Sequence, residues 1–163
     1  MLAALPGARA VGGCVRDALA GREPADIDVA APFAPSDIVI RLRAAGLKVF
    51  ETGLAHGTVT AVKQHLPVEV TALRRDVLTD GRHAVVEWTT DWREDAARRD
   101  FTINAMYYDP ESQIVVDYHK GMADAQKRVI RMIGDAAQRY REDPVRLMRA
   151  VRISAKLAGL GFK

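Results

Sequence analysis

Apolar and polar residues alternate along several short segments of the chain, which is the pattern of half-buried β-strands. Between these segments, apolar residues recur with a helical period over 14–20 and 36–45, and each stretch is followed by a glycine, a frequent helix-ending residue. Strands and helices mixed in this order predict an α+β domain. The alternating segments predict strands over residues 9–11, 26–29, 47–50, 58–62, 68–73 and 114–117.

The second half of the chain predicts longer elements. Residues 74–95 are polar and contain a Thr-Asp-Gly turn, so they predict a partly mobile loop that carries a short strand. Helices are predicted over 92–107 and over 135–157, whereas 129–133 fits a strand or a helix equally well.

The C-terminal predicted helix has two different faces at about 100° per residue. On its polar side, Asp143, Arg146, Arg149 and Arg152 follow one another at intervals of three residues and span roughly 13–14 Å. Asp143 and Arg146 together offer the acceptors and donors that could read a base edge, and the last two arginines would lie nearer the phosphates. A solvated arginine-rich face is the equally weighted alternative. The apolar face consists of Pro144, Leu147, Met148, Val151 and Ala155.

Composition excludes several classes of protein. The chain has 163 residues, of which 48% are hydrophobic and 28% charged, values typical of a packed globular domain and not of a disordered tail. A single cysteine, Cys14, excludes an internal disulfide and fits a reducing compartment. The sequence predicts no membrane span and no export signal, so we expect a cytoplasmic protein.

The charge distribution points to a polyanionic partner. The net charge is only +3, but 18 of the 24 basic residues are arginine, the side chain best suited to bidentate phosphate contact. Residues 139–163 carry seven basic and two acidic residues, a local net charge of +5.

Asp26 and Asp28 have the spacing of a metal-binding pair. On a strand, residues i and i+2 point to the same face about 7 Å apart, and two carboxylates placed there can share Mg²⁺ ions for phosphoryl transfer. Glu69 lies on the polar face of the strand predicted over 68–73. Solvent-exposed acids are the alternative for each of these residues taken alone.

Two further segments strengthen the metal interpretation. Gly12 and Gly13 follow a predicted strand and open a predicted helix that carries Arg16, an arrangement that suits a phosphate cradle. In the second segment, Asn104 lies within a predicted helix although asparagine is a poor helix former, which favours a functional reason for it.

With these motifs in place, the sequence resembles the class II CCA-adding tRNA nucleotidyltransferases and bacterial poly(A) polymerases, within the polymerase β-like superfamily. The matching segments cover nearly the whole chain and follow the order of the family. They are Gly-Gly-Cys-Val-Arg-Asp at 12–17, Asp-Ile-Asp at 26–28, Arg-Arg-Asp-Phe-Thr-Ile-Asn-Ala at 98–105, Glu-Asp-Pro-Val-Arg at 142–146 and Arg-Ala-Val-Arg at 149–152.

The resemblance implies a nucleotidyltransferase head with a mixed, largely antiparallel sheet over residues 1–134, followed by the beginning of a helical neck over 135–163. It implies that Asp26, Asp28 and Glu69 bind two Mg²⁺ ions that serve template-independent addition of nucleotides to an RNA 3′ end. The chain stops just inside the neck, whose apolar face would then be exposed and could drive self-association.

Ten further residues are implied to bind the nucleotide. By resemblance, Asp143 and Arg146 pair with the incoming base. The remaining residues contact phosphate or ribose, and they are Gly12, Gly13, Arg16, Arg99, Asp100, Asn104, Arg149 and Arg152.

Two members of the family remain open as the specific activity. Residues 53–60 resemble CCA-adding enzymes, which use CTP and ATP on tRNA, and the Gly-Arg-Arg/Lys-Phe signature of bacterial poly(A) polymerases is absent between 29 and 57. Residues 139–146 resemble poly(A) polymerases, which use ATP alone on diverse RNA ends. A truncated head that binds nucleotides without productive turnover is a further alternative.

Overall fold

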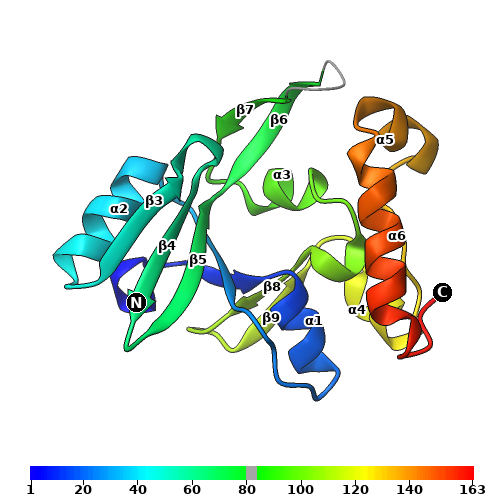
Figure 1. The fold of residues 1–163 in the computed structure, drawn as a ribbon, viewed down its shortest axis with the longest axis horizontal. Helices are drawn as coiled ribbons and strands as arrows, with labels where there is room; N and C mark the ends of the chain where they lie inside the picture. The colour runs from blue at the N-terminus through cyan, green and yellow to red at the C-terminus, as the bar shows by residue number, and fades with distance from the viewer. Residues whose placement is uncertain (80–83) are drawn as a thin grey trace.

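The computed structural model describes residues 1–79 and 84–163. A seven-stranded sheet in the order β3-β4-β5-β2-β1-β8-β9 forms the centre, and α2 lies at the opposite end of the molecule from α5 and α6 (Figure 1). This arrangement confirms the α+β prediction. The strands are β1 (Arg9–Val11), β2 (Asp28–Ala31), β3 (Lys48–Gly53), β4 (Thr58–Lys63), β5 (Leu66–Ala72), β8 (Met106–Asp109) and β9 (Ile114–Asp117).

The sheet is mixed and largely antiparallel, as the resemblance implies. Only β2 and β5 pair in parallel, with Asp28 opposite Glu69, and the other neighbouring strands in this sheet are antiparallel. Along β5, Val70 and Ala72 are buried while Glu69 is exposed, so the predicted alternation is confirmed. Two candidate carboxylates therefore lie on neighbouring central strands.

Short helices connect and cover the strands. The first residue of α2 is a proline, whose fixed φ suits a helix start, and its Ile38 and Leu42 are fully buried against the β3–β5 end of the sheet. No helix within 1–79 or 84–163 is both long and apolar enough to cross a membrane. The helical segments outside the C-terminal region are η1 (Leu2–Ala4), α1 (Gly13–Leu19), α2 (Pro35–Ala44), η2 (Leu54–His56), α3 (Trp92–Ala97), η3 (Thr102–Asn104) and α4 (Gly121–Gln126).

The segment predicted as a loop over 74–95 contains a second sheet. Strands β6 (Arg74–Thr79) and β7 (Ala84–Trp88) pair as an antiparallel hairpin, so the prediction of one short strand is wrong. Among the hairpin residues whose burial is described, Arg75, Val77, Glu87 and Trp88 are exposed, which fits the polar composition of the segment. The predicted turn at 79–81 lies largely outside the described residues.

The helix predicted over 92–107 is also wrong, because it ends at Ala97. The chain then turns through η3 and enters β8, where Met106 and Tyr107 are fully buried between β1 and β9. Tertiary pairing with two strands therefore outweighs the local helical pattern. Residues 129–133, which fit either element, form neither, and Met132 makes an isolated bridge with Phe101.

The strand predicted over 26–29 begins two residues later, at Asp28. Asp26 lies in a bend before the strand, so the prediction that both aspartates occupy one strand face is wrong. The ladder with β5 begins only at Asp28, and residues before it have no strand partner to hold them extended.

The predicted C-terminal helix is broken at Pro144. The chain forms α5 (Ala136–Glu142) and α6 (Val145–Ala158), with Asp143 between them in an extended conformation. Proline disfavours a helical backbone at the residue before it, which explains the break. Asp143 therefore does not belong to the helical series, whereas Arg146, Arg149 and Arg152 do.

The orientation of α6 places its basic side toward the head. Arg146, Ile153 and Leu157 are buried, and the last two pack with Phe101 and Ile103. The predicted apolar face points away from the described protein, with Met148 68% exposed. The expectation of an exposed apolar face is therefore confirmed, and its exposed large side chains are Leu147, Met148 and Val151.

Candidate active site

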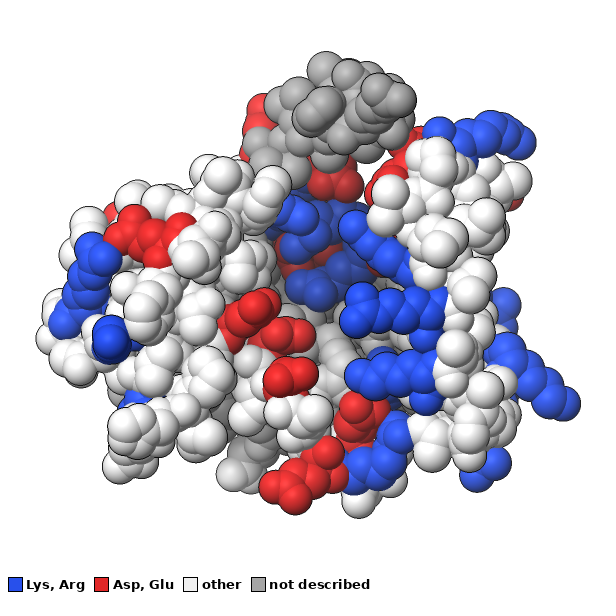
Figure 2. All heavy atoms as spheres, viewed as in Figure 1, with Lys and Arg blue, Asp and Glu red and all other residues white. Residues whose placement is uncertain are grey.

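An open cleft lies between α6, the start of α1 and residues 98–104, and none of the three candidate carboxylates is among its lining residues. Its volume is about 450 Å³. Figure 2 shows basic side chains reaching from the α6 side across a hollow, with acidic side chains on the sheet side. Seven of the predicted site residues line the cleft, together with Arg98, Phe101, Ile153 and Lys156. The seven are Gly13, Arg16, Arg99, Asp100, Asn104, Arg149 and Arg152.

The three candidate carboxylates lie close to one another on the sheet side. Asp28 and Glu69 are register partners on parallel strands, and Asp26 is two residues from Asp28. Partial desolvation raises the pKa of Asp28, and repulsion from Glu69 and Asp26 adds to the rise, while the positive charge of Arg99 opposes it. The carboxylates thus carry a mutual repulsion that a cation would relieve.

The donor chemistry of this group fits a hard divalent cation. Carboxylate oxygens are the ligands that Mg²⁺ prefers. A bound cation would also offset the repulsion between Asp28 and its acidic neighbours. In the described part of the chain, no group of three or more His, Cys, Asp or Glu side chains is arranged as a ready metal site. Binding would therefore require these side chains to converge.

The glycine pair lies against a fixed arginine. Gly12 has φ 83° and ψ −133°, a conformation that favours glycine, and it leads directly into α1. Arg16 is only 3% exposed, and its guanidinium donates to both Asp17 oxygens at 3.0 and 3.1 Å and to Asn104 Oδ1 at 2.6 Å. A Cβ at Gly13 would lie 3.3 Å from Arg16 Nη2, so the second glycine keeps this space open.

The contact between Arg16 and Asn104 accounts for the unusual asparagine. It joins two motifs that lie 88 residues apart in the sequence. Asn104 lies in η3 and not in a long helix, so its predicted element is wrong, and a functional reason for it stays a prediction.

A buried aspartate organises the arginines beside the carboxylates. Asp95 is 1% exposed, forms ion pairs with Arg98 at 2.8 Å and Arg99 at 3.0 Å, and accepts a 2.7 Å hydrogen bond from Tyr107. Desolvation would raise the pKa of Asp95, but the two arginines and the Tyr107 hydroxyl outweigh it and hold that pKa below its usual value. The sequence-based site contained Arg99 but neither Asp95 nor Tyr107.

Desolvation also raises the pKa of Tyr107, so this hydroxyl stays protonated and continues to donate. The sequence could have predicted the two ion pairs of Asp95. This residue lies three and four positions before Arg98 and Arg99, which is the spacing of ion pairs on a helix. Tyr107 comes from β8 whereas Asp95 lies on α3, and no local pattern connects the two residues.

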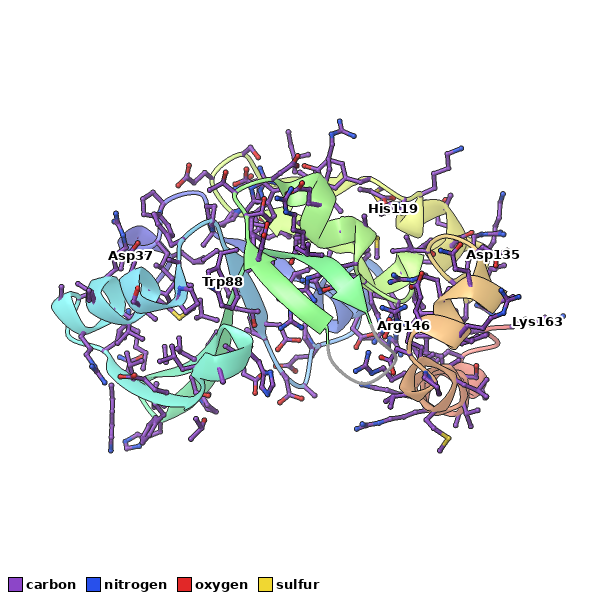
Figure 3. The ribbon with its side chains drawn as sticks, turned by 90° about the horizontal axis from the view of Figure 1, so that it is seen from above. Asp37, Trp88, His119, Asp135, Arg146 and Lys163 are labelled. Atoms are coloured by element: carbon purple, nitrogen blue, oxygen red, sulfur yellow. The ribbon has the colours of Figure 1, made fainter. Side chains whose placement is uncertain are left out.

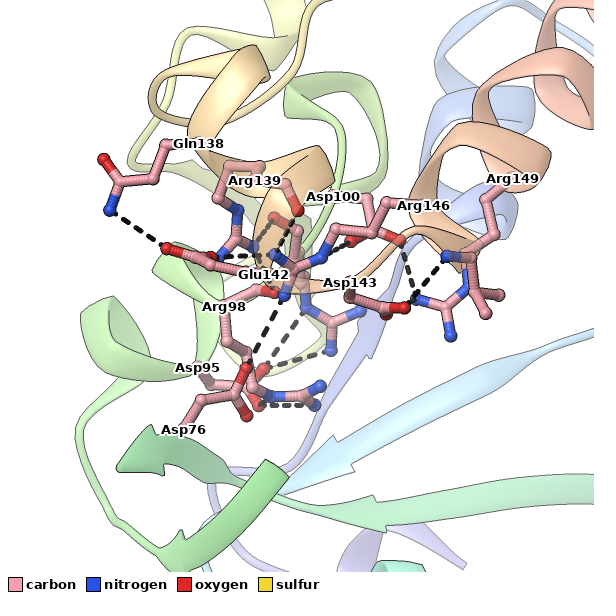
Figure 4. A network of polar contacts seen from close by, with 12 residues as sticks. Asp76, Asp95, Arg98, Asp100, Gln138, Arg139, Glu142, Asp143, Arg146 and Arg149 are labelled. Carbon is pink, nitrogen blue, oxygen red and sulfur yellow. Dashed lines mark hydrogen bonds and ion pairs between the residues drawn. The ribbon is translucent and has the colours of Figure 1, made fainter. Parts of the chain in front are cut away.

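Arg146 is held in a network of carboxylates at the α5–α6 break (Figure 4). It is 4% exposed and donates to Glu142 at 3.0 Å and to the Arg139 carbonyl at 3.2 Å. Its Nε lies 3.1 Å from Asp100 Oδ1, an ion pair without hydrogen-bond alignment. Arg146 is therefore buried, and the alternative of a solvated arginine-rich face does not hold for this residue.

The network extends to the hairpin and to Asp143. Arg146 Nη2 lies 3.9 Å from Asp76 on β6, and the view from above shows Arg146 on the inner side of the C-terminal helices while Lys163 lies at the outer edge (Figure 3). Asp143 accepts from the Val145 backbone N–H at 3.0 Å and lies 4.0 Å from Arg149. Asp143 and Arg146 both lie at the N-terminal end of α6, although Asp143 lies outside the helix.

Arg139 fixes this region to the head of the protein. Its guanidinium donates to the backbone carbonyls of Arg98 and Arg99 at 2.8 and 3.1 Å. Like Glu142, it belongs to a segment that carries the family resemblance, but sequence reasoning gave neither residue a role in the site.

The fold and the site combine a mixed sheet, on which Asp28 and Glu69 are paired, with a basic cleft along α6 (Figure 2). The family described as Poly A polymerase head domain matches residues 8–131, which is most of the chain. The chain belongs to this family.

The relatives that this chain resembles are named for two different activities. The chain is 42% identical over 151 residues to CCA tRNA nucleotidyltransferase 1, mitochondrial, of Danio rerio, a match that covers 92% of this chain and 35% of that protein. It is 38% identical over 161 residues to Poly(A) polymerase I of Haemophilus influenzae, covering 90% of this chain and 34% of that protein.

A solved structure supports the same relationship. The Bacillus stearothermophilus CCA-adding enzyme in complex with CTP is 37% identical, with a TM-score of 0.79, over 90% of this chain and 34% of that chain. This chain therefore spans about a third of the length of the relatives that it matches.

Proposed function

We propose that this protein is a template-independent RNA nucleotidyltransferase that adds CCA to tRNA 3′ ends from CTP and ATP. The observation that carries the proposal is a basic cleft whose lining residue Arg99 acts electrostatically on Asp28, the register partner of Glu69 on the neighbouring strand. The relatives named for CCA addition, one of them solved with CTP, support the choice of substrates.

Asp26, Asp28 and Glu69 would hold two Mg²⁺ ions. When bound, Mg²⁺ would supply activation of the terminal 3′-hydroxyl and stabilisation of charge on the leaving pyrophosphate. Arg99, whose charge already acts on Asp28, adds positive charge beside the reacting phosphate. The fixed guanidinium of Arg16 and the space left by Gly12 and Gly13 admit phosphate oxygens closely.

The base and sugar would be held at the other end of the cleft. Asp143 offers an acceptor and Arg146 a donor, the pair of functions that a base edge requires. Glu142 and Asp100 hold the Arg146 side chain before a nucleotide arrives, so its position is set in advance. Asp100 and Asn104 lie where they can contact ribose or phosphate, and Arg149 and Arg152 extend the phosphate contacts along α6.

We also propose the division of the chain into a catalytic head over 1–134 and the beginning of a neck over 135–163. The break at Pro144 and the exposed apolar face of α6 support a neck that begins here. The buried contacts of Ile153 and Leu157 with Phe101 and Ile103 would then form the junction between the two parts.

Poly(A) synthesis is the second candidate. The match to the Poly A polymerase head domain and the resemblance at residues 139–146 favour it, and it differs from CCA addition in using ATP alone. The same cleft serves either reaction, because phosphate binding does not depend on the base.

Primer extension distinguishes the candidates. A tRNA that lacks its terminal CCA would be incubated with Mg²⁺ and each labelled nucleotide singly, then with CTP and ATP together. Addition of two C residues followed by one A would support CCA addition, and a ladder of A alone would support poly(A) synthesis. Binding of ATP and CTP with no extension would mean that this chain binds nucleotides without sufficient grip on RNA.

A further inference from the structure

The charges that line the cleft are strongly unbalanced. Among the described residues, six basic side chains line it and Asp100 is the one acidic residue. The six are Arg16, Arg98, Arg99, Arg149, Arg152 and Lys156. A polyanion is the ligand class that this imbalance favours.

Four of the six basic residues already have a carboxylate partner. Arg16 pairs with Asp17 at 3.0 Å, and Arg98 and Arg99 share the buried Asp95. Arg149 pairs with Asp100 at 3.0 Å. These pairs fix the side chains and lower the positive charge that each contributes to a ligand.

Arg152 and Lys156 differ from the other four. Both side chains belong to exposed residues, and neither makes an ion pair or a side-chain hydrogen bond within the described part of the chain. They lie four residues apart on one face of α6, so their charges act on the same volume of the cleft.

The two ends of α6 therefore differ in how far their positive charges are balanced by carboxylates. The N-terminal end, at Arg146 and Arg149, is balanced by Glu142, Asp100 and the nearby Asp143. Lys156 lies seven residues beyond Arg149, a rise of about 10.5 Å along the helix. The uncompensated positive charge of Arg152 and Lys156 therefore lies beyond Arg149, away from the end that would hold the base.

We propose that Lys156, a residue outside the sequence-predicted site, binds the terminal phosphates of the incoming nucleotide and hence the leaving pyrophosphate. The proposal rests on the nucleotidyltransferase function proposed above and adds a phosphate contact one helical turn beyond Arg152. A flexible ammonium suits this position, because it follows the terminal phosphates without the fixed geometry that a bidentate arginine imposes.

Nucleotide binding tests the proposal without requiring RNA or turnover. Calorimetry with Mg²⁺ would compare ATP, ADP and AMP on the wild-type chain and on Lys156→Met, which keeps the apolar stem and removes the charge. Lys63→Met, at an exposed lysine on β4, is the matched control. Lys156→Arg tests whether positive charge suffices.

We expect Lys156→Met to weaken ATP binding about five- to tenfold, to weaken ADP binding less and to leave AMP binding unchanged. Lys156→Arg should retain most of the ATP affinity, and the control should match the wild type. Equal weakening for all three nucleotides, or unchanged ATP affinity in Lys156→Met, would overturn the role of Lys156.

The two proposals fail in different ways. If the wild-type chain binds ATP no better than AMP, the phosphate site of the proposed function is wrong as a whole, and with it the role of Lys156. If the wild type prefers ATP and Lys156→Met keeps that full preference, only the role of Lys156 is overturned.

Discussion

The two walls of the candidate site, the carboxylates on the sheet and the basic residues near α6, satisfy their charges in opposite ways. On the sheet wall, Asp28 faces Glu69 and Asp26 and its pKa is raised by desolvation and by their repulsion. On the helical wall, Arg146 is buried among acceptors, and desolvation at the nearby Asp95 is outweighed by two arginines. The sheet wall is strained in the absence of a ligand, whereas the part of the helical wall around Arg146 is already balanced by carboxylates.

The difference separates residues that await a ligand from residues that shape the site. An uncompensated charge costs free energy until a ligand of opposite charge arrives, whereas a paired charge contributes mainly to structure. Removing a carboxylate from the sheet wall should therefore impair catalysis but not folding, and removing a partner from the helical wall should impair folding first.

The largest expected effect is on catalysis at the sheet wall. Asp28→Asn should lower nucleotide transfer by about 10³-fold or more, because it removes a proposed metal ligand. The same change should raise the unfolding temperature of the metal-free protein by about 1–2 °C, because it removes repulsion. Extension assays and calorimetry measure the two effects.

Glu23→Gln is a control for the loss of one exposed negative charge near the same loop. It should change neither quantity. A folded Asp28→Asn variant with full activity would contradict the proposed role of Asp28, and a lowered unfolding temperature would contradict the repulsion.

The next largest effect is on stability at the helical wall. Arg146→Ala leaves Glu142 and Asp100 without their buried cation, and we expect it to cost about 3 kcal/mol of unfolding free energy. Arg149→Ala, at a side chain that is 55% exposed, should cost less than about 1 kcal/mol. Urea unfolding compares the two, and equal costs would show that burial of Arg146 does not matter.

The pH dependence of stability should have opposite signs at the two walls. The Asp28 pKa is raised on folding, so its penalty exists above the ordinary carboxyl value of 3.8 and is lost as pH falls through the folded pKa. The Asp95 pKa is lowered, so its contribution is present above 3.8 and is lost only as pH falls below that value.

Accordingly, Asp28→Asn should be more stable than the wild type at pH 7, and Asp95→Asn should be less stable. The Asp28 difference should shrink as pH falls toward 3.8, whereas the Asp95 difference should shrink only below 3.8, where the carboxyl of the unfolded chain becomes protonated first. Unfolding measured in metal-free buffer at several pH values tests this pattern. Differences of the same sign at pH 7 would remove the contrast between the walls.

The smallest expected effect concerns the hydrogen bond from Tyr107 to the buried Asp95. Tyr107→Phe removes the hydroxyl that donates to Asp95 at 2.7 Å and should cost about 1 kcal/mol. Tyr108→Phe, on the exposed side of the same strand, is the control and should be neutral. No loss in Tyr107→Phe would mean that the two arginines alone hold Asp95.

Local sequence patterns predicted several strands correctly, but not the elements that depend on pairing with distant segments. The strands at 9–11, 58–62 and 114–117 agree with the structure because alternation reports directly on which face is buried. The helix over 92–107 was wrong because Phe101 and Tyr107 fit a helical or an extended pattern, and pairing of β8 with β1 and β9 decides between them.

The site shows the same limit. The residues that line the cleft follow from motifs, but the burial of Arg146 depends on Asp100 and Asp76, which are distant in sequence. The sequence did not predict a role for Lys156, because the ion pairs of the other basic residues that line the cleft are known only from the structure. Pro144 was present in the sequence, and its effect on Asp143 could have been anticipated.

The most direct test of the two-wall account is ATP affinity with and without Mg²⁺, measured by calorimetry on the wild type and on Asp28→Asn. The account predicts that Mg²⁺ strengthens ATP binding to the wild type by about tenfold or more and has little effect on the variant. An equal gain in both proteins would show that the cation binds the nucleotide alone and that the sheet wall plays no part.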